Sequence, residues 1–75
     1  MSDAPLTEEA IRILTAMELA GTAGTGAEPL AARTGLDKAV VLEHLVDFWD
    51  RGLVEQMAGV RGLYRITDAG RAQLA

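Results

Sequence analysis

The stretch LAARTGLDKAVVLEHL, residues 30–45, predicts the end of one helix, a tight turn and the beginning of the next helix. Gly35 suits the left-handed conformation in which helices commonly end, and Asp37 is a good capping residue for the helix that follows. We therefore expect one helix over about residues 27–33 and another over about residues 38–51.

One more helix is expected upstream, over about residues 7–20. Thr7 can accept a hydrogen bond from the first turn, and Glu8 and Glu9 favour the positive end of the helix dipole. Apolar residues then recur at helical spacing, so one face of this helix can enter a core; they stand at positions 10, 13, 14, 17 and 20.

The segment GTAGTG, residues 21–26, predicts a loop that leads into the second helix. Its two outer glycines have the spacing of a phosphate-binding loop. Ala27 stands where that motif requires a lysine, however, so nucleotide binding is not expected. Thr25 and Glu28 instead have the spacing of a capping box at the start of the helix.

The C-terminal part of the chain predicts a hairpin and a short helix. Two β-like runs, residues 54–57 and 63–67, are separated by two glycines with Arg61 between them, which places this arginine at the tip of the turn. The threonine that ends the second run can cap a last short helix in DAGRAQLA, residues 68–75.

The totals limit the kind of protein. The chain has 75 residues, so residues 1–75 are expected to form a single small domain, and since it begins with Met1 we expect it to be complete. Its net charge of −4 disfavours binding to phosphate backbones, which draws on cations. It has no cysteine, which excludes disulfides and thiolate metal sites. It has no basic N-terminal segment followed by a long apolar run and no apolar segment of membrane-spanning length, so we expect a cytoplasmic protein without membrane association.

The predicted order of elements is α+β: a three-helix core, a two-stranded β-hairpin and a short C-terminal helix. Over about residues 7–75 it resembles the winged helix-turn-helix superfamily, in which the hairpin is the wing. The residues that carry the resemblance are Leu30, Ala31, Gly35, Val41, Leu45, Phe48, Gly52, Leu53, Val54, Tyr64, Ile66, Thr67 and Gly70. The resemblance implies a DNA-binding transcriptional regulator.

The third helix has two apolar stripes at about 100° per residue. Val41, Leu45 and Phe48 form the first together with His44, and this face is expected to pack under the first two helices. His44, the only histidine, is expected to be a half-buried helix residue rather than a ligand or a base.

The second stripe supplies the candidate protein-interface residues, which are Leu42, Val46 and Trp49, with Ala39 in line with them. Two interpretations are open. The last helix or the N-terminal arm covers the stripe within the chain, or the stripe forms an interface with a second copy or another protein. The acidic residues beside it, Glu43, Asp47 and Asp50, would suit a basic partner and would repel phosphates.

The resemblance also implies a groove-reading side of the third helix. It would consist of Lys38, Ala39, Leu42, Glu43 and Val46, which offer one cation, one anion and three apolar groups. Glu43 can accept a hydrogen bond from a cytosine amino group. The cations at the helix ends and in the wing complete the candidate DNA contacts, which are Arg33, Lys38, Ala39, Glu43, Arg61 and Arg65.

Two functions therefore stay open from the sequence. The first is a winged-helix DNA-binding protein that regulates transcription. The second is a winged-helix interaction module, a homodimer or an adaptor, that does not bind DNA. We expect no enzyme: the sequence indicates no catalytic residue, no metal ligands and no cofactor site.

Overall fold

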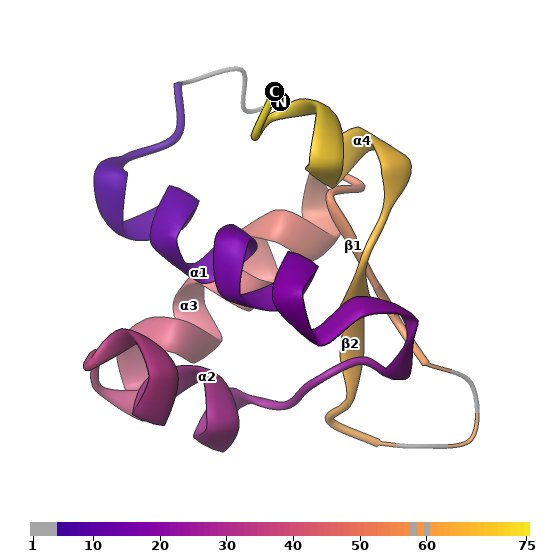
Figure 1. Ribbon diagram of the computed structural model, residues 1–75. Helices are drawn as coiled ribbons and strands as arrows, with labels where there is room; N and C mark the ends of the chain where they lie inside the picture. Colours follow the sequence, from indigo (N-terminus) through magenta and orange to yellow (C-terminus); the bar gives the residue numbers. More distant parts are fainter. Residues whose placement is uncertain (1–4, 58, 60) are drawn as a thin grey trace.

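The computed structural model describes residues 5–57, 59 and 61–75. Three helices form a core with a hairpin at one side and a short helix against its end (Figure 1). The elements are α1 (Glu8–Ala20), the 3-10 turn η1 (Gly21–Ala23), α2 (Ala27–Thr34), α3 (Lys38–Asp50), β1 (Val54–Gln56), β2 (Tyr64–Ile66) and α4 (Asp68–Ala72).

Helix α1 begins where the sequence predicts. The Thr7 hydroxyl accepts a hydrogen bond from the Ala10 amide at 3.1 Å, and Glu8 and Glu9 occupy the first turn. The helix ends at Gly21, whose φ of 67° leaves the helical region. Its buried face consists of four of the five predicted stripe residues and Ala16, whereas Ala20, the fifth, is only half-buried.

The turn between α2 and α3 also follows the sequence signals. Gly35 has a φ of 76° and donates its backbone N–H to the Ala31 carbonyl at 2.9 Å, the left-handed helix end that favours glycine. Asp37 is the residue before α3, but its side chain makes no capping hydrogen bond. The prediction of the helix start is confirmed, and the predicted role of the Asp37 carboxylate is wrong.

The predicted capping box at the start of α2 is also wrong. The residue before the helix is Gly26, which makes no side-chain cap, and Thr25 is buried. The Thr25 backbone instead pairs with Tyr64 of β2 through two hydrogen bonds of 2.7 and 2.9 Å. The loop thus adds a third, one-residue strand position to the hairpin. A Cβ at position 26 would lie 3.1 Å from the Gly62 carbonyl oxygen, so a glycine allows this close approach.

Strands β1 and β2 pair antiparallel and form the predicted hairpin. The register places Val54 opposite Ile66 and Glu55 opposite Arg65. A further backbone bond joins the Met57 amide to the Leu63 carbonyl, just beyond the strands. Each strand is thus slightly shorter than the predicted runs, 54–57 and 63–67.

A single apolar cluster lies between the helices and the inner face of the hairpin. The largest of its fully buried side chains is Phe48 of α3, and burial of such side chains is the main stabilising contribution to a fold of this size. The buried apolar residues are Ala10, Ile13, Leu14, Ala16, Met17, Leu30, Val41, Leu45, Phe48, Leu53, Val54 and Ile66.

Helix α4 closes one end of the core by packing against α1 and β2. The Thr67 hydroxyl caps it by accepting from the Gly70 amide at 3.1 Å, as the sequence predicts, and donates to the Gly52 carbonyl at 2.7 Å. One hydroxyl therefore joins the start of α4 to the end of α3. The whole arrangement is a winged helix-turn-helix, with α2 and α3 as the helix-turn-helix and β1–β2 as the wing.

Among the described residues, no helix has the length and apolar character needed to cross a membrane.

Candidate nucleic-acid interface

Helix α3 has one face in the core and one face in solvent. Val41, Leu45 and Phe48 are buried against the rest of the core, as the sequence predicts. The exposed residues of α3 are Lys38, Ala39, Leu42, Glu43, Val46, Trp49 and Asp50. In Figure 1 the C-terminal part of α3 passes behind α1.

The apolar stripe on the exposed face is not covered by the last helix. The exposed fractions of Leu42, Val46 and Trp49 are 43%, 64% and 46%. Helix α4 packs on α1 and β2 instead. The interpretation that α4 covers the stripe is therefore wrong, and the part of the N-terminal arm before residue 5 lies outside the described residues. Three large apolar side chains thus stand in partial contact with water.

The wing contributes an aromatic side chain beside this stripe. The rings of Trp49 and Tyr64 meet edge to face, with centroids 6.0 Å apart and planes at 85°. An open hollow of about 220 Å³ adjoins the pair, lined by Leu45, Val46, Trp49, Asp50, Gln56 and Tyr64. Tyr64 is absent from the residues predicted for the site. The signal that could have identified Tyr64 is the alternation of side chains along β2. Ile66 faces the core, and Tyr64, two residues earlier, therefore lies on the same side of the strand.

The acidic residues of α3 differ in their surroundings. Asp47 forms an ion pair with Arg51 one turn later, at 3.0 Å, so part of its charge is balanced on the same helix. Glu43 and Asp50 have no ion-pair or hydrogen-bond partner among the described residues. The repulsion of phosphates that the sequence suggests for this face therefore comes mainly from Glu43 and Asp50.

The predicted cationic contacts fall into two groups. Arg33, in the last turn of α2, and Arg61, in the turn of the wing, are exposed and have no ion-pair partner within the described residues. Lys38, at the start of α3, lies 3.7 Å from the Glu28 carboxylate. That distance and the exposure of both groups leave the ammonium available, since such surface pairs are weak.

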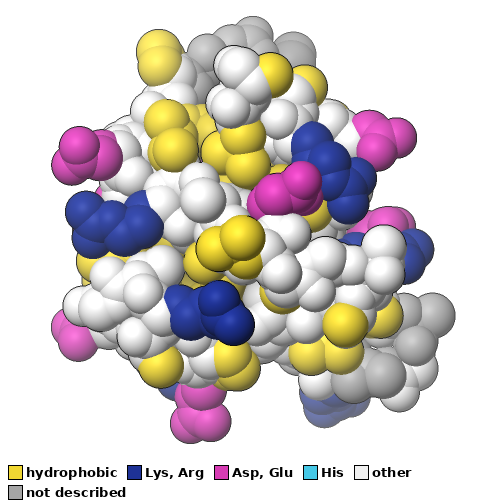
Figure 2. Space-filling view, viewed as in Figure 1, with side chains coloured by type: hydrophobic (Ala, Val, Ile, Leu, Met, Phe, Trp, Pro, Cys, Tyr) yellow, Lys and Arg dark blue, Asp and Glu magenta, His cyan; other side chains and the backbone are white. Residues whose placement is uncertain are grey.

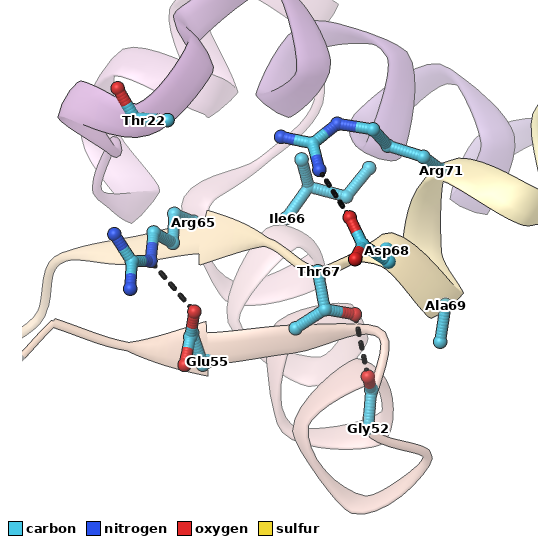
Figure 3. A pocket seen from close by; sticks show the side chains of 9 residues that line it. All are labelled: Thr22, Gly52, Glu55, Arg65, Ile66, Thr67, Asp68, Ala69 and Arg71. Carbon is cyan, nitrogen blue, oxygen red and sulfur yellow. Dashed lines mark hydrogen bonds and ion pairs between the residues drawn. The ribbon is translucent and has the colours of Figure 1, made fainter.

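Arg65 lies on a different side of the wing from Trp49. It follows Tyr64 directly on β2, and neighbouring residues of a strand point to opposite faces. Its guanidinium contacts the Glu55 carboxylate across the hairpin at 2.7 Å (Figure 3). Arg65 is therefore not brought together with the exposed face of α3.

The outer side of the wing carries a polar hollow of about 440 Å³ (Figure 3). Arg65 and Arg71 both line it, and both are held by carboxylates. Arg71 contacts Glu18 at 2.8 Å and Asp68 at 3.0 Å. Because each guanidinium already has an acidic partner, the hollow offers little free positive charge to a ligand. The lining residues are Thr22, Gly52, Glu55, Arg65, Ile66, Thr67, Asp68, Ala69 and Arg71.

His44 joins two helices. Its Nε2 lies 2.9 Å from an oxygen of Glu9, and its ring lies against Phe48 with centroids 5.9 Å apart. The expectation of a half-buried helix residue is confirmed. Within the part of the chain that the structure describes, no group of three potential ligands is suited to a metal ion.

The face of the molecule that carries α1 has mixed charges. Figure 2 shows cationic, acidic and hydrophobic side chains interspersed over this face, without a continuous band of one sign. Phosphate binding draws on clustered cations, so this face does not have the character of a nucleic-acid surface.

Comparison with known proteins gives matches among solved structures. No protein-family profile matches the chain, and no curated protein matches it. The MosR transcriptional regulator of M. tuberculosis superposes with a TM-score of 0.79 at 30% identity, over 92% of this chain and 50% of that one.

Two further structures agree with the first. The PcaV transcriptional regulator of Streptomyces coelicolor, crystallised with its natural ligand, gives a TM-score of 0.78 at 26% identity, over 97% of this chain and 53% of that chain. ZitR of Lactococcus lactis, a zinc-responsive MarR family member, gives 0.69 at 20% identity, over 96% and 51%. The chain thus spans about half the length of these proteins. It has the winged-helix fold of transcriptional regulators, and the proteins that it matches here are regulators rather than enzymes.

Proposed function

We propose that the chain is a DNA-binding domain of a transcriptional regulator, that residues 1–75 form this single domain, and that it works in the cytoplasm. The observation that carries the proposal is the superposition of more than nine-tenths of the chain on MosR and PcaV, with TM-scores of 0.79 and 0.78. Fold similarity alone does not establish function, so the proposal also needs a surface that suits DNA.

The exposed face of α3 has the position that DNA binding requires. In winged-helix proteins the second helix of the helix-turn-helix enters the major groove, and the wing contacts the backbone or the adjacent groove. Here the buried face of α3 packs against the core, and the opposite face is exposed to solvent. We propose that Ala39 and Glu43 contact base edges on this face.

Three of the predicted cations lie in the helix-turn-helix and in the wing. Arg33 precedes the turn into α3, Lys38 begins α3, and Arg61 lies in the wing. We propose that these three side chains contact phosphates, since single cations spread along a surface position a protein on the duplex without reading its sequence. Arg65 is the weakest of the predicted contacts because Glu55 holds it on the other side of the wing.

A titration of the 75-residue chain into a labelled random-sequence duplex, at several salt concentrations, tests the proposal. Three phosphate contacts predict a logarithmic salt slope of about −2 to −3, from roughly −0.9 for each contact. The proposal is overturned if the duplex is not bound at low salt at concentrations of roughly 10⁻⁴ M, since non-specific binding of such domains is commonly stronger than that.

A second candidate function rests on the exposure of Leu42, Val46 and Trp49. Apolar side chains on one exposed helix face, with Glu43 and Asp50 at its edge, also suit a contact with a second copy or with a basic partner protein. Under this proposal the chain is an interaction module, a homodimer or an adaptor. The two candidates predict different oligomeric states. If the exposed face of α3 binds DNA, the chain without DNA does not self-associate through α3, whereas a self-association face gives a dimer.

A further inference from the structure

The exposed part of α3 that would enter a groove carries almost no hydrogen-bond donors. Ala39, Leu42 and Val46 are apolar, and the carboxylate of Glu43 only accepts hydrogen bonds. Lys38 is the one donor side chain in this set, and it stands at the first residue of the helix, near Glu28. Apart from Lys38, this face therefore has no side chain that can form the donor contacts that recognise guanine.

The base edges of the major groove include groups that match this chemistry. The 5-methyl group of thymine is apolar and projects into the groove, and the N4 amino group of cytosine is a donor. Guanine presents only acceptors, N7 and O6, and adenine presents its N6 donor beside the N7 acceptor, which repels a carboxylate. An apolar and acidic helix face is therefore complementary to pyrimidines rather than to purines.

We infer that α3 reads pyrimidines directly, with Leu42 and Val46 packing on thymine methyl groups and the Glu43 carboxylate accepting from a cytosine amino group. The inference rests on the proposed DNA-binding function and specifies which groups of DNA the site recognises. It assigns Leu42 and Val46, two of the three residues of the exposed apolar stripe, to the groove, where their contact with water is lost on binding.

The spacing along the helix supports contacts with neighbouring base pairs. Leu42 and Val46 are one turn apart, a rise of about 6 Å. Successive bases on one strand are about 3.4 Å apart, so the two side chains reach bases about two steps apart. Glu43 follows Leu42 at about 100° around the helix and points to a different base of the same short site.

The size of each effect follows from the chemistry. Burial of one methyl group corresponds to about a fourfold change in affinity. A carboxylate that accepts from cytosine gives discrimination of about fivefold or more against other bases. A site with two thymine contacts should therefore lose about 10- to 20-fold when both methyl groups are removed.

The test begins with selection of bound duplexes from a random-sequence pool by the 75-residue chain. The enriched duplex is then compared with the same duplex in which single thymines are replaced by uracil, which lacks only the 5-methyl group. We expect enriched sites to contain thymine and cytosine on one strand within a few base pairs. We also expect uracil at one or two positions to weaken binding about fourfold each.

Variants separate direct contact from altered DNA shape. In Leu42→Ala or Val46→Ala, the ratio of affinities for thymine and uracil duplexes should fall to about one at a single position. Leu19→Ala, at an exposed apolar residue of α1, should retain the full ratio. Glu43→Gln should remove the preference for cytosine at one position, since glutamine can also donate to adenine.

Three outcomes contradict the inference in different ways. Enriched sites that are bound equally well with uracil and thymine, and without a cytosine preference, overturn the inference and leave the proposed function intact. A loss with uracil that persists unchanged in Leu42→Ala and Val46→Ala indicates an effect of DNA shape and also overturns it. Failure to enrich any duplex, together with self-association of the chain, removes the proposed function and the inference together.

Discussion

The indole of Trp49 meets the ring of Tyr64 edge to face, with centroids 6.0 Å apart, and so joins the C-terminal half of α3 to strand β2 of the wing. The backbone of Tyr64 is itself held by Thr25 through two hydrogen bonds. The aromatic contact and the strand pairing therefore add to the core packing of Val54 and Ile66 in orienting the wing relative to α3.

This aromatic contact should be measurable as a coupling free energy. A double-mutant cycle with Trp49→Leu and Tyr64→Leu is expected to give about 0.5–1 kcal/mol, the lower part of the range for aromatic pairs because Trp49 is partly exposed. Urea denaturation of the four proteins gives the value. Additive effects of the two substitutions would mean that the rings do not interact in solution.

Phe48 should contribute most to the free energy of unfolding. It is the largest of the fully buried side chains, so Phe48→Ala is expected to lower the unfolding free energy by about 3–5 kcal/mol, which is enough to unfold a domain of this size. Circular dichroism and thermal melting measure the result. The matched control is Leu19→Ala on α1, whose side chain is 73% exposed and whose loss should change stability by less than about 0.5 kcal/mol. Equal melting temperatures of the two variants would contradict the described core.

Gly70 should not accept a side chain. A Cβ at this position would overlap the Leu53 carbonyl oxygen and would lie 2.6 Å from Cγ1 of Ile66, inside the packing of α4 against the wing. We expect Gly70→Ala to destabilise the fold by about 1–3 kcal/mol although alanine favours helices. Ala69→Ser, at the exposed neighbouring position, is the control. A Gly70→Ala variant as stable as the unaltered protein would show that α4 packs differently.

Arg61 should contribute to DNA affinity without reading the sequence. Arg61→Ala is expected to weaken binding to all duplexes alike and to make the logarithmic salt slope about 1 unit shallower, since one phosphate contact is lost. Titrations at several salt concentrations measure both quantities. Arg71→Ala is the comparison, because Glu18 and Asp68 already hold this guanidinium and a smaller change is expected. An unchanged affinity and salt slope in Arg61→Ala would remove Arg61 from the contacts.

Leu42→Glu separates the two candidate functions. The position is exposed, so the fold should persist, while the added carboxylate repels phosphates or disrupts an apolar protein contact. If α3 binds DNA, the variant loses affinity for duplexes, and neither the variant nor the unaltered protein self-associates through this face. If α3 forms a homodimer seam, light scattering shows an unaltered protein that self-associates and a variant that does not.

Local signals in the sequence predicted most of the fold. The caps by Thr7 and Thr67 and the helix end at Gly35 each depend on residues within a few positions of one another, and all three are confirmed. The buried stripe of α1 is confirmed except at Ala20, which is half-buried. Asp37 and Thr25 show the limit of such signals. Both have suitable types for caps, yet the Asp37 carboxylate makes no cap bond and Thr25 pairs with Tyr64, a residue 39 positions later in the chain.

The candidate site was less accessible from the sequence because it depends on long-range contacts. The sequence predicted correctly which elements carry the cations, but not which carboxylates form ion pairs with them. Arg71 contacts Glu18, 53 positions away, and Glu55 holds Arg65 across the hairpin. The exposure of Leu42, Val46 and Trp49 likewise depended on where α4 packs. The periodicity of α3 placed these three side chains on one stripe but did not determine what covers it.

The most direct test of the account is the footprint of duplex DNA on the backbone amide spectrum of the ¹⁵N-labelled chain. If α3 faces the groove, we expect the largest chemical-shift changes at Ala39, Leu42, Glu43 and Val46, with further changes at Arg33 and in the wing near Arg61. The outer faces of α1 and α4 should change little. Changes concentrated around the polar hollow at Arg65 and Arg71, or no changes in α3 at saturating duplex, would contradict the claim that α3 is the DNA-binding helix.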